Sequence, residues 1–156
     1  MSKIGFIQDK SEVLATGSTL TIVQLVAGTN HPISILGWGV GFNSVAAADE
    51  PILCRLRIQT SAGTSGTGTI EQQDRQHNAT FDTSALIDFT AEPTDGGDLV
   101  DVWPTKMVHP SSGYELWYPE GKEPTIATAE RVGLQVISGV LATSLDEVSG
   151  FIFFEE

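Results

Sequence analysis

The segment Arg131-Val132-Gly133-Leu134-Gln135-Val136 carries the pattern that decides the fold. Its apolar side chains, Val132, Leu134 and Val136, are two residues apart, and Arg131 and Gln135 occupy alternate positions. Successive side chains of a β-strand point to opposite faces of its sheet. The spacing therefore predicts a strand with one face in the core and one face in water.

The same alternation recurs in Cys54-Arg55-Leu56-Arg57-Ile58-Gln59, and almost no stretch repeats apolar residues at helical spacing. Turn residues separate the apolar runs throughout the chain. The predicted strands are residues 4–8, 19–26, 32–42, 52–59, 85–90, 99–103, 114–118, 131–137 and 150–154. About nine short strands at this spacing predict an all-β fold, a β-sandwich or jelly roll of antiparallel sheets.

The chain has 156 residues, the length of one domain. We expect a single sandwich domain over residues 18–156, preceded by a segment over 1–17. Within that segment, Ile4-Gly5-Phe6-Ile7 is apolar and leads into polar residues. It is either an extended arm that adds a strand to a neighbour's sheet or the first strand of the domain's own sheet.

Two polar stretches lie between the predicted strands. Residues 60–69 contain only Thr, Ser, Ala and Gly, and we expect them to form an exposed, mobile loop. Residues 71–80 permit a turn or two of helix, and their structure stays open.

The charge balance limits the partners. The chain has 20 acidic residues against 8 Lys and Arg, a net charge of −12, yet only 18% of its residues are charged. This acid excess repels phosphate backbones and anionic lipids, so we expect neither nucleic acid nor membrane as a partner. No uninterrupted apolar run has the length of a membrane span, and the N-terminus lacks the apolar region of a signal peptide.

The chain contains one cysteine, Cys54, which cannot form an internal disulfide. Its place in an alternating strand predicts a small core residue, and a reducing cytoplasm is the expected compartment.

An unusual run of glycines occurs in Gly37-Trp38-Gly39-Val40-Gly41-Phe42, where every second residue is glycine. Three glycines on one face of a strand indicate a bend, a large neighbouring side chain that fills the space, or the close approach of another backbone. Under the last interpretation Gly37, Gly39 and Gly41 are candidate subunit or capsid contacts. Ile4, Phe6 and Ile7 are the other candidates.

A search for chemistry nominates no catalytic, cofactor-binding or metal-binding residue. The Gly37 to Gly41 run lacks the spacing of a dinucleotide-binding loop, and His31, His77 and His109 share no metal-ligand spacing. Asp95-Gly96-Gly97-Asp98 could hold calcium, but it lacks the arrangement of a calcium loop, and acidic turns are usually just solvated. We therefore expect a protein without enzymatic activity and without a cofactor.

Aromatic residues offer an alternative binding function. Exposed aromatic rings beside acidic groups can form a sugar platform on a β-sandwich, with Trp103 and Trp117 as its candidates. In residues 114–118 the alternation places Tyr114, Leu116 and Tyr118 on one face, and Glu115 and Trp117 on the other. At least one of these two sets must belong to the core.

Several ordered runs in residues 50–156 resemble a group of small β-rich proteins encoded by tailed bacteriophages. The runs are Arg57-Ile-Gln-Thr-Ser-Ala-Gly-Thr-Ser65, Phe89-Thr-Ala-Glu-Pro-Thr94, Tyr118-Pro-Glu-Gly-Lys-Glu-Pro124, Arg131-Val-Gly-Leu-Gln-Val136 and Phe153-Phe-Glu-Glu156. The group looks like virion components of the capsid decoration (cement) type.

The resemblance implies a virion protein on the outer surface of the capsid, assembled in the host cytoplasm. Its expected partners are the major capsid protein and further copies of itself, as a homo-oligomer and most simply a trimer. Multivalent attachment would supply an avidity that no single contact gives. The alternative that stays open is a carbohydrate-binding or tail receptor-binding β-sandwich.

Overall fold

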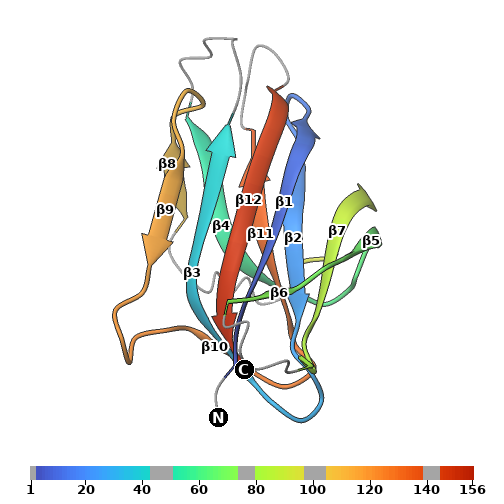
Figure 1. The fold of residues 1–156 in the computed structure, drawn as a ribbon. Helices are drawn as coiled ribbons and strands as arrows, with labels where there is room; N and C mark the ends of the chain where they lie inside the picture. The colour runs from blue at the N-terminus through green and yellow to red at the C-terminus, as the bar shows by residue number, and fades with distance from the viewer. Residues whose placement is uncertain (1–2, 43–50, 74–79, 97–104, 139–144) are drawn as a thin grey trace.

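The computed structural model describes residues 3–42, 51–73, 80–96, 105–138 and 145–156. These residues form two antiparallel sheets packed face to face, which confirms the predicted all-β sandwich. Figure 1 shows β3, β12 and β1 in front of β4, β11 and β2. In the described part of the chain, no helix is long and apolar enough to cross a membrane.

The first sheet has the strand order β10-β3-β12-β1-β6, and β9 also pairs with β3. Its strands are β1 (Ile4–Leu14), β3 (Ile33–Phe42), β6 (Glu71–Gln72), β9 (Tyr114–Trp117), β10 (Thr125–Ile126) and β12 (Leu145–Glu155). The long strand β12 lies between β3 and β1 and pairs with both along most of its length.

The second sheet has the strand order β5-β7-β2-β11-β4-β8. Its strands are β2 (Thr19–Val26), β4 (Ile52–Gln59), β5 (Thr64–Gly68), β7 (Ser84–Ala91), β8 (Lys106–Val108) and β11 (Arg131–Ile137). The observed bounds of β2, β4 and β11 are those that the sequence predicts.

The core fills the space between the two sheets. Trp38 and Phe154 are its largest buried side chains, and Val132, Leu134 and Val136 of β11 are also fully buried, as their alternation predicts. The two sheets are in close contact at the glycine of β12: a Cβ atom on Gly150 would lie 2.8 Å from Cδ2 of Leu134.

The expectation of a mobile loop over residues 60–69 is wrong. Residues Thr64–Gly68 form the edge strand β5, which pairs with β7 from Thr64 opposite Ala91 to Gly68 opposite Ala85. Its Thr, Ser and Gly side chains give no hydrophobic alternation, so only the backbone pairing reveals the strand. In the undecided stretch 71–80, Glu71–Gln72 form the short strand β6.

The face of the second sheet that the sequence predicts to be in solvent is only partly exposed. Thr21, Gln24, Gln59 and Gln135 point away from the core, yet each is at most 3% exposed. They are covered by chain segments that hydrogen-bond to them: Gln24 Nε2 donates to the Ser61 carbonyl at 3.0 Å, and Gln135 Nε2 donates to Asp95 Oδ1 at 2.9 Å. Alternation predicted the direction of these side chains but not the segments that cover them.

The N-terminal segment belongs to the first sheet. Ile4–Leu14 form β1, which pairs with β12 on one side and with β6 on the other. Of the two alternatives for this segment, the single chain therefore adopts the strand of its own sheet. The strand predicted over residues 99–103 lies outside the described residues.

Candidate functional site

The three glycines of β3 form a row on the outer face of the first sheet. The side chains between them, Trp38 and Val40, are buried in the core, so the alternation of the strand directs Gly37, Gly39 and Gly41 outward. Strands β9 and β12 flank the row on its two sides. The glycine row is therefore a depression in the outer surface of the sheet, between two strands that carry larger side chains.

Aromatic rings lie directly on two of these glycines. A Cβ atom on Gly37 would lie 2.6 Å from Cε3 of Trp117, and one on Gly39 would lie 2.5 Å from Cε1 of Phe151. Strand register explains the match, because Gly37 pairs with Trp117 and Gly39 pairs with Phe151. At these two positions the interpretation that a large neighbouring side chain fills the space is confirmed.

Four aromatic side chains from three strands form a continuous cluster across this face, which we call the aromatic stripe: Phe6, Trp117, Phe151 and Phe153. The ring of Phe153 lies 5.0 Å from that of Phe6 and 5.0 Å from that of Trp117, between centroids. Trp117 is 51% exposed, and the three phenylalanines are half-buried. The stripe is thus an apolar surface in contact with solvent.

The residues predicted as contacts from the N-terminal segment separate in the structure. Phe6 points outward and belongs to the aromatic stripe. Ile7 points the other way and is 2% exposed in the core, so its side chain is not available to a partner. Ile4 is half-buried at the beginning of β1.

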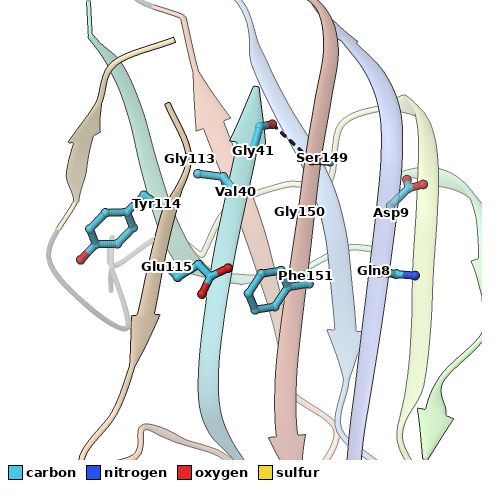
Figure 2. A pocket seen from close by; sticks show the side chains of 10 residues that line it. All are labelled: Gln8, Asp9, Val40, Gly41, Gly113, Tyr114, Glu115, Ser149, Gly150 and Phe151. Atoms are coloured by element: carbon cyan, nitrogen blue, oxygen red, sulfur yellow. Dashed lines mark hydrogen bonds between the residues drawn. The ribbon is translucent and has the colours of Figure 1, made fainter. Parts of the chain in front are cut away.

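A groove of about 580 Å³ begins beside the stripe, where the glycine row reaches Gly41. Figure 2 shows the groove crossing β9, β3, β12 and β1. Its lining residues are Gln8, Asp9, Val40, Gly41, Gly113, Tyr114, Glu115, Ser149, Gly150 and Phe151. The Ser149 hydroxyl donates to the Gly41 carbonyl at 3.3 Å, drawn as the dashed line in Figure 2.

The groove lies where no ring from another described strand covers the third glycine. Among the described residues other than its chain neighbours, the atom closest to a Cβ on Gly41 would be Ser149 Oγ, at 2.9 Å. Gly113 borders the same space from the chain just before β9. The volume lies within the range typical of ligand sites.

One row of paired residues crosses the sheet at the boundary between stripe and groove. Gly39 pairs with Glu115 on one side and with Phe151 on the other, and Phe151 pairs with Gln8. Glu115 and Gln8 are exposed. The groove therefore has an aromatic ring in its floor, a carboxylate at one wall and an amide at the other.

Residues 114–118 divide between core and surface as their alternation requires. Tyr118 is buried, Leu116 and Tyr114 are half-buried, and Trp117 and Glu115 are exposed. The indole N–H of Trp38 donates to the Tyr118 hydroxyl at 3.1 Å. Burial raises the pKa of Tyr118 to about 12, so this phenol stays protonated in its structural role. Trp103, the second platform candidate, lies outside the described residues.

The structure places Cys54 in the core and two of the three histidines, His31 and His109, at the surface. Cys54 is fully buried, and burial raises the pKa of its thiol to about 12, as expected for a core cysteine. His31 and His109 are exposed, and His77 lies outside the described residues. Within the described part of the chain, no group of three or more His, Cys, Asp or Glu side chains could hold a metal ion.

Asp95, the first acid of the candidate calcium turn, forms ion pairs with two arginines. Asp95 Oδ2 lies 3.2 Å from Nε of Arg57 and 3.4 Å from Nη2 of Arg55. Its other oxygen accepts the hydrogen bond from Gln135. Asp98, the second acid of the proposed calcium turn, lies outside the described residues.

Sequence reasoning named Phe6, Trp117 and the glycines but missed Phe151 and Phe153. Both phenylalanines belong to the predicted strand Gly150-Phe151-Ile152-Phe153-Phe154. All four residues after the glycine are apolar, so the strand has no alternation of apolar and polar side chains. Such a run does not reveal which face is outward. The signal lay in the glycines of β3, which require bulky neighbours on adjacent strands.

No known protein family matches the sequence, and no curated protein is similar to it in sequence. Among solved structures, the chain is similar to that of the Gx strain of infectious bursal disease virus, with 16% identity and a TM-score of 0.23 over 99% of this chain and 42% of the other. A mutant VP2 protein of the same virus, from T=1 particles, gives 15% identity and a TM-score of 0.25 over 99% and 40%. The VP2 subviral particle of this virus gives 13% identity and a TM-score of 0.24 over 99% and 41%. The chain thus spans about two fifths of the length of the viral chains to which it is similar.

Proposed function

We propose that the protein is a non-enzymatic structural protein of a virion, a decoration protein that binds the outer surface of a phage capsid. The observation that carries this proposal is the aromatic stripe, with Trp117 51% exposed among three half-buried phenylalanines. The resemblance of residues 50–156 to phage decoration proteins supports the choice of partner. The docking surface is then the outer face of the first sheet, and the partner is the major capsid protein.

Aromatic rings exposed to water cost free energy that binding recovers. A contiguous apolar patch at the surface of a soluble domain marks an interaction site, and aromatic residues supply much of the binding energy of protein interfaces. The glycines fix Trp117 and Phe151 against the backbone, so little side-chain entropy is lost on binding. The stripe is a rigid surface, suited to a shell that is itself rigid.

Oligomerisation belongs to the same proposal. One stripe of four rings gives modest affinity, whereas a trimer that engages several capsid subunits gains avidity through multivalency. The net charge of −12 keeps many copies soluble and mutually repulsive except where they dock. A protein that stays monomeric at high concentration in sedimentation experiments would contradict this part of the proposal.

Co-sedimentation with capsid shells encoded by the same genome tests the proposal. We expect the wild-type protein to sediment with the shells, and Trp117→Ser and Phe153→Ser to weaken binding by about tenfold or more each, the effect of losing an interface anchor. The matched control is Met107→Ser, since Met107 is 69% exposed on β8 of the other sheet. No sedimentation of the wild type, or equal loss with the control, would contradict the proposal.

A second candidate function is carbohydrate binding, favoured by one arrangement. Trp117 and Glu115 are both exposed on the same face of β9. An exposed ring beside a carboxylate suits a sugar that stacks on the ring and donates hydroxyl hydrogen bonds to the carboxylate. A glycan array in which Trp117→Ala abolishes a specific signal would support it. An array without a specific signal would contradict it.

A further inference from the structure

We propose that the groove at Gly41 is the socket for a basic, extended segment of the partner protein, in which an Arg or Lys side chain pairs with Glu115. This inference rests on the proposed docking function and adds the chemistry of the segment that the capsid protein would contribute. It assigns to the groove a role distinct from that of the aromatic stripe beside it.

The three glycines of the row differ in what covers them. The chain's own rings cover Gly37 and Gly39, whereas for Gly41 the nearest atom to a Cβ position, among described residues other than its chain neighbours, is the Ser149 hydroxyl. Together with Gly113 it leaves the groove of about 580 Å³ bordered by backbone and small side chains. Glycine lets another backbone approach closely, so the groove suits an extended chain.

The charge of the groove favours a basic partner. Among the described lining residues two are acidic, Asp9 and Glu115, and none is Lys or Arg. Asp9 pairs with Gly150, whose Cβ position faces the core, so Glu115 is the carboxylate that the groove presents to a partner. Glu115 is exposed, and Figure 2 shows its side chain extending from β9 at one wall of the groove. The whole chain carries a net charge of −12. Complementary charge steers association and selects the partner, so a basic segment is favoured over a neutral or acidic one.

The floor of the groove suits a long basic side chain. Phe151 lies between the two walls in the row that joins Glu115 to Gln8. Its ring can contact the aliphatic part of a long basic side chain and attract the cationic head. Three strand spacings separate β9 from β1, roughly 14 Å, a distance that four residues of an extended peptide span. A segment of about this length would cross the groove from wall to wall.

The test uses the intact protein and a capped seven-residue peptide of alanine and serine with arginines at its second and sixth positions. Amide NMR spectra are recorded during titration with this peptide, with the same peptide carrying glutamates in place of the arginines, and with a neutral oligosaccharide. We expect the arginine peptide alone to shift the signals of Gly41, Gly113 and Phe151. Glu115→Gln should weaken its binding about three- to fivefold, the value of one partly exposed charge pair.

The control variant is Glu120→Gln, which removes an equal charge from an exposed position outside the groove, and it should leave peptide affinity unchanged. Equal binding of the two peptides, equal effects of the two variants, or no shift at Gly41 and Gly113 would overturn the inference. Shifts at these glycines with the oligosaccharide alone would also overturn it and assign the groove to sugars.

Shell binding separates failure of the inference from failure of the proposed function. If Trp117→Ser weakens co-sedimentation and Glu115→Gln does not, the decoration function stands and the basic socket is wrong. If the wild-type protein does not sediment with shells, the proposed function fails, whatever the peptide does. Weakening by both variants, with Glu120→Gln unchanged, supports both.

Discussion

The ring of Phe151 lies on the backbone of Gly39, so close that a Cβ atom at residue 39 would be 2.5 Å from Cε1 of the ring. Phe151 is in turn 5.6 Å from Phe153, and Phe153 is 5.0 Å from Trp117, between ring centroids. Gly39 therefore allows the ring of Phe151, at one end of the aromatic stripe, to pack directly against the backbone of β3.

The first prediction concerns this contact. Gly39→Ala should lower the free energy of unfolding by about 1–3 kcal/mol, because the added methyl group displaces a packed ring. The measurement is urea unfolding followed by tryptophan fluorescence. The matched control is Gly66→Ala on β5, where the closest atom to a new Cβ would be Asp88 Oδ2 at 3.4 Å, and this variant should be close to neutral.

A double variant identifies the cause. Adding Phe151→Ala to Gly39→Ala should recover part of the loss, giving a non-additive cycle for two residues in contact. Strict additivity of the two substitutions would show that the ring is not what makes alanine costly at residue 39.

The sequence predicted the sandwich well because its central strands alternate cleanly. Thr19–Val26, Ile52–Gln59 and Arg131–Ile137 were found with their observed bounds. Edge strand β5 was missed, because a strand held mainly by backbone pairing does not need an apolar face. Burial of Gln24 and Gln135 was missed as well, because it depends on segments remote in sequence that fold over the sheet.

Individual residues of the candidate site were predicted, but their arrangement was not. The glycine row, Phe6 and Trp117 were each identified from local patterns, but nothing local showed that they share a face. That relationship requires the order β9-β3-β12-β1, which joins strands separated by most of the chain. The groove at Gly41 follows from the same order and was not predicted.

The second prediction concerns acid stability. Burial alone would raise the pKa of Glu156, but hydrogen bonds from Thr83, from the Asp82 N–H and from Lys3 outweigh burial and lower it. Since the folded pKa is the lower one, the carboxylate stabilises the fold above its unfolded pKa, and this contribution is lost as the pH falls through the folded value.

Glu156→Gln should therefore lower the free energy of unfolding at neutral pH by about 1–3 kcal/mol, the value of charged hydrogen bonds. The difference from wild type should shrink as the pH is lowered through the pKa region of the carboxyl group. Thermal unfolding between pH 3 and pH 7 measures it, and a difference that stays constant with pH would contradict the assignment.

The third prediction concerns the polar cluster on the second sheet. Asp95 pairs with Arg57, whose side chain is 4% exposed, and Asp95 itself is 29% exposed. Asp95→Asn removes the carboxylate charge that compensates a largely buried guanidinium, and we expect the free energy of unfolding in urea to fall by about 1–3 kcal/mol. Glu120→Gln is the exposed control, and equal stability of the two variants would contradict a structural role for Asp95.

The fourth prediction concerns the thiol. Because Cys54 is fully buried and its pKa is about 12, a disulfide exchange reagent such as Ellman's reagent should not label the native protein at pH 8. Labelling should become complete in denaturing urea. Rapid labelling of the folded protein would show that β4 opens readily at this position.

The central claim is that the outer face of the first sheet is the surface that docks on a capsid. A cryo-electron microscopy map of shells carrying the protein tests it most directly, because it shows which face meets the shell. We predict several copies around a symmetry axis, with Trp117 and Phe153 in contact with the capsid protein and the second sheet turned outward. A map in which the first sheet faces solvent, or in which the protein occurs only on the tail, would contradict it.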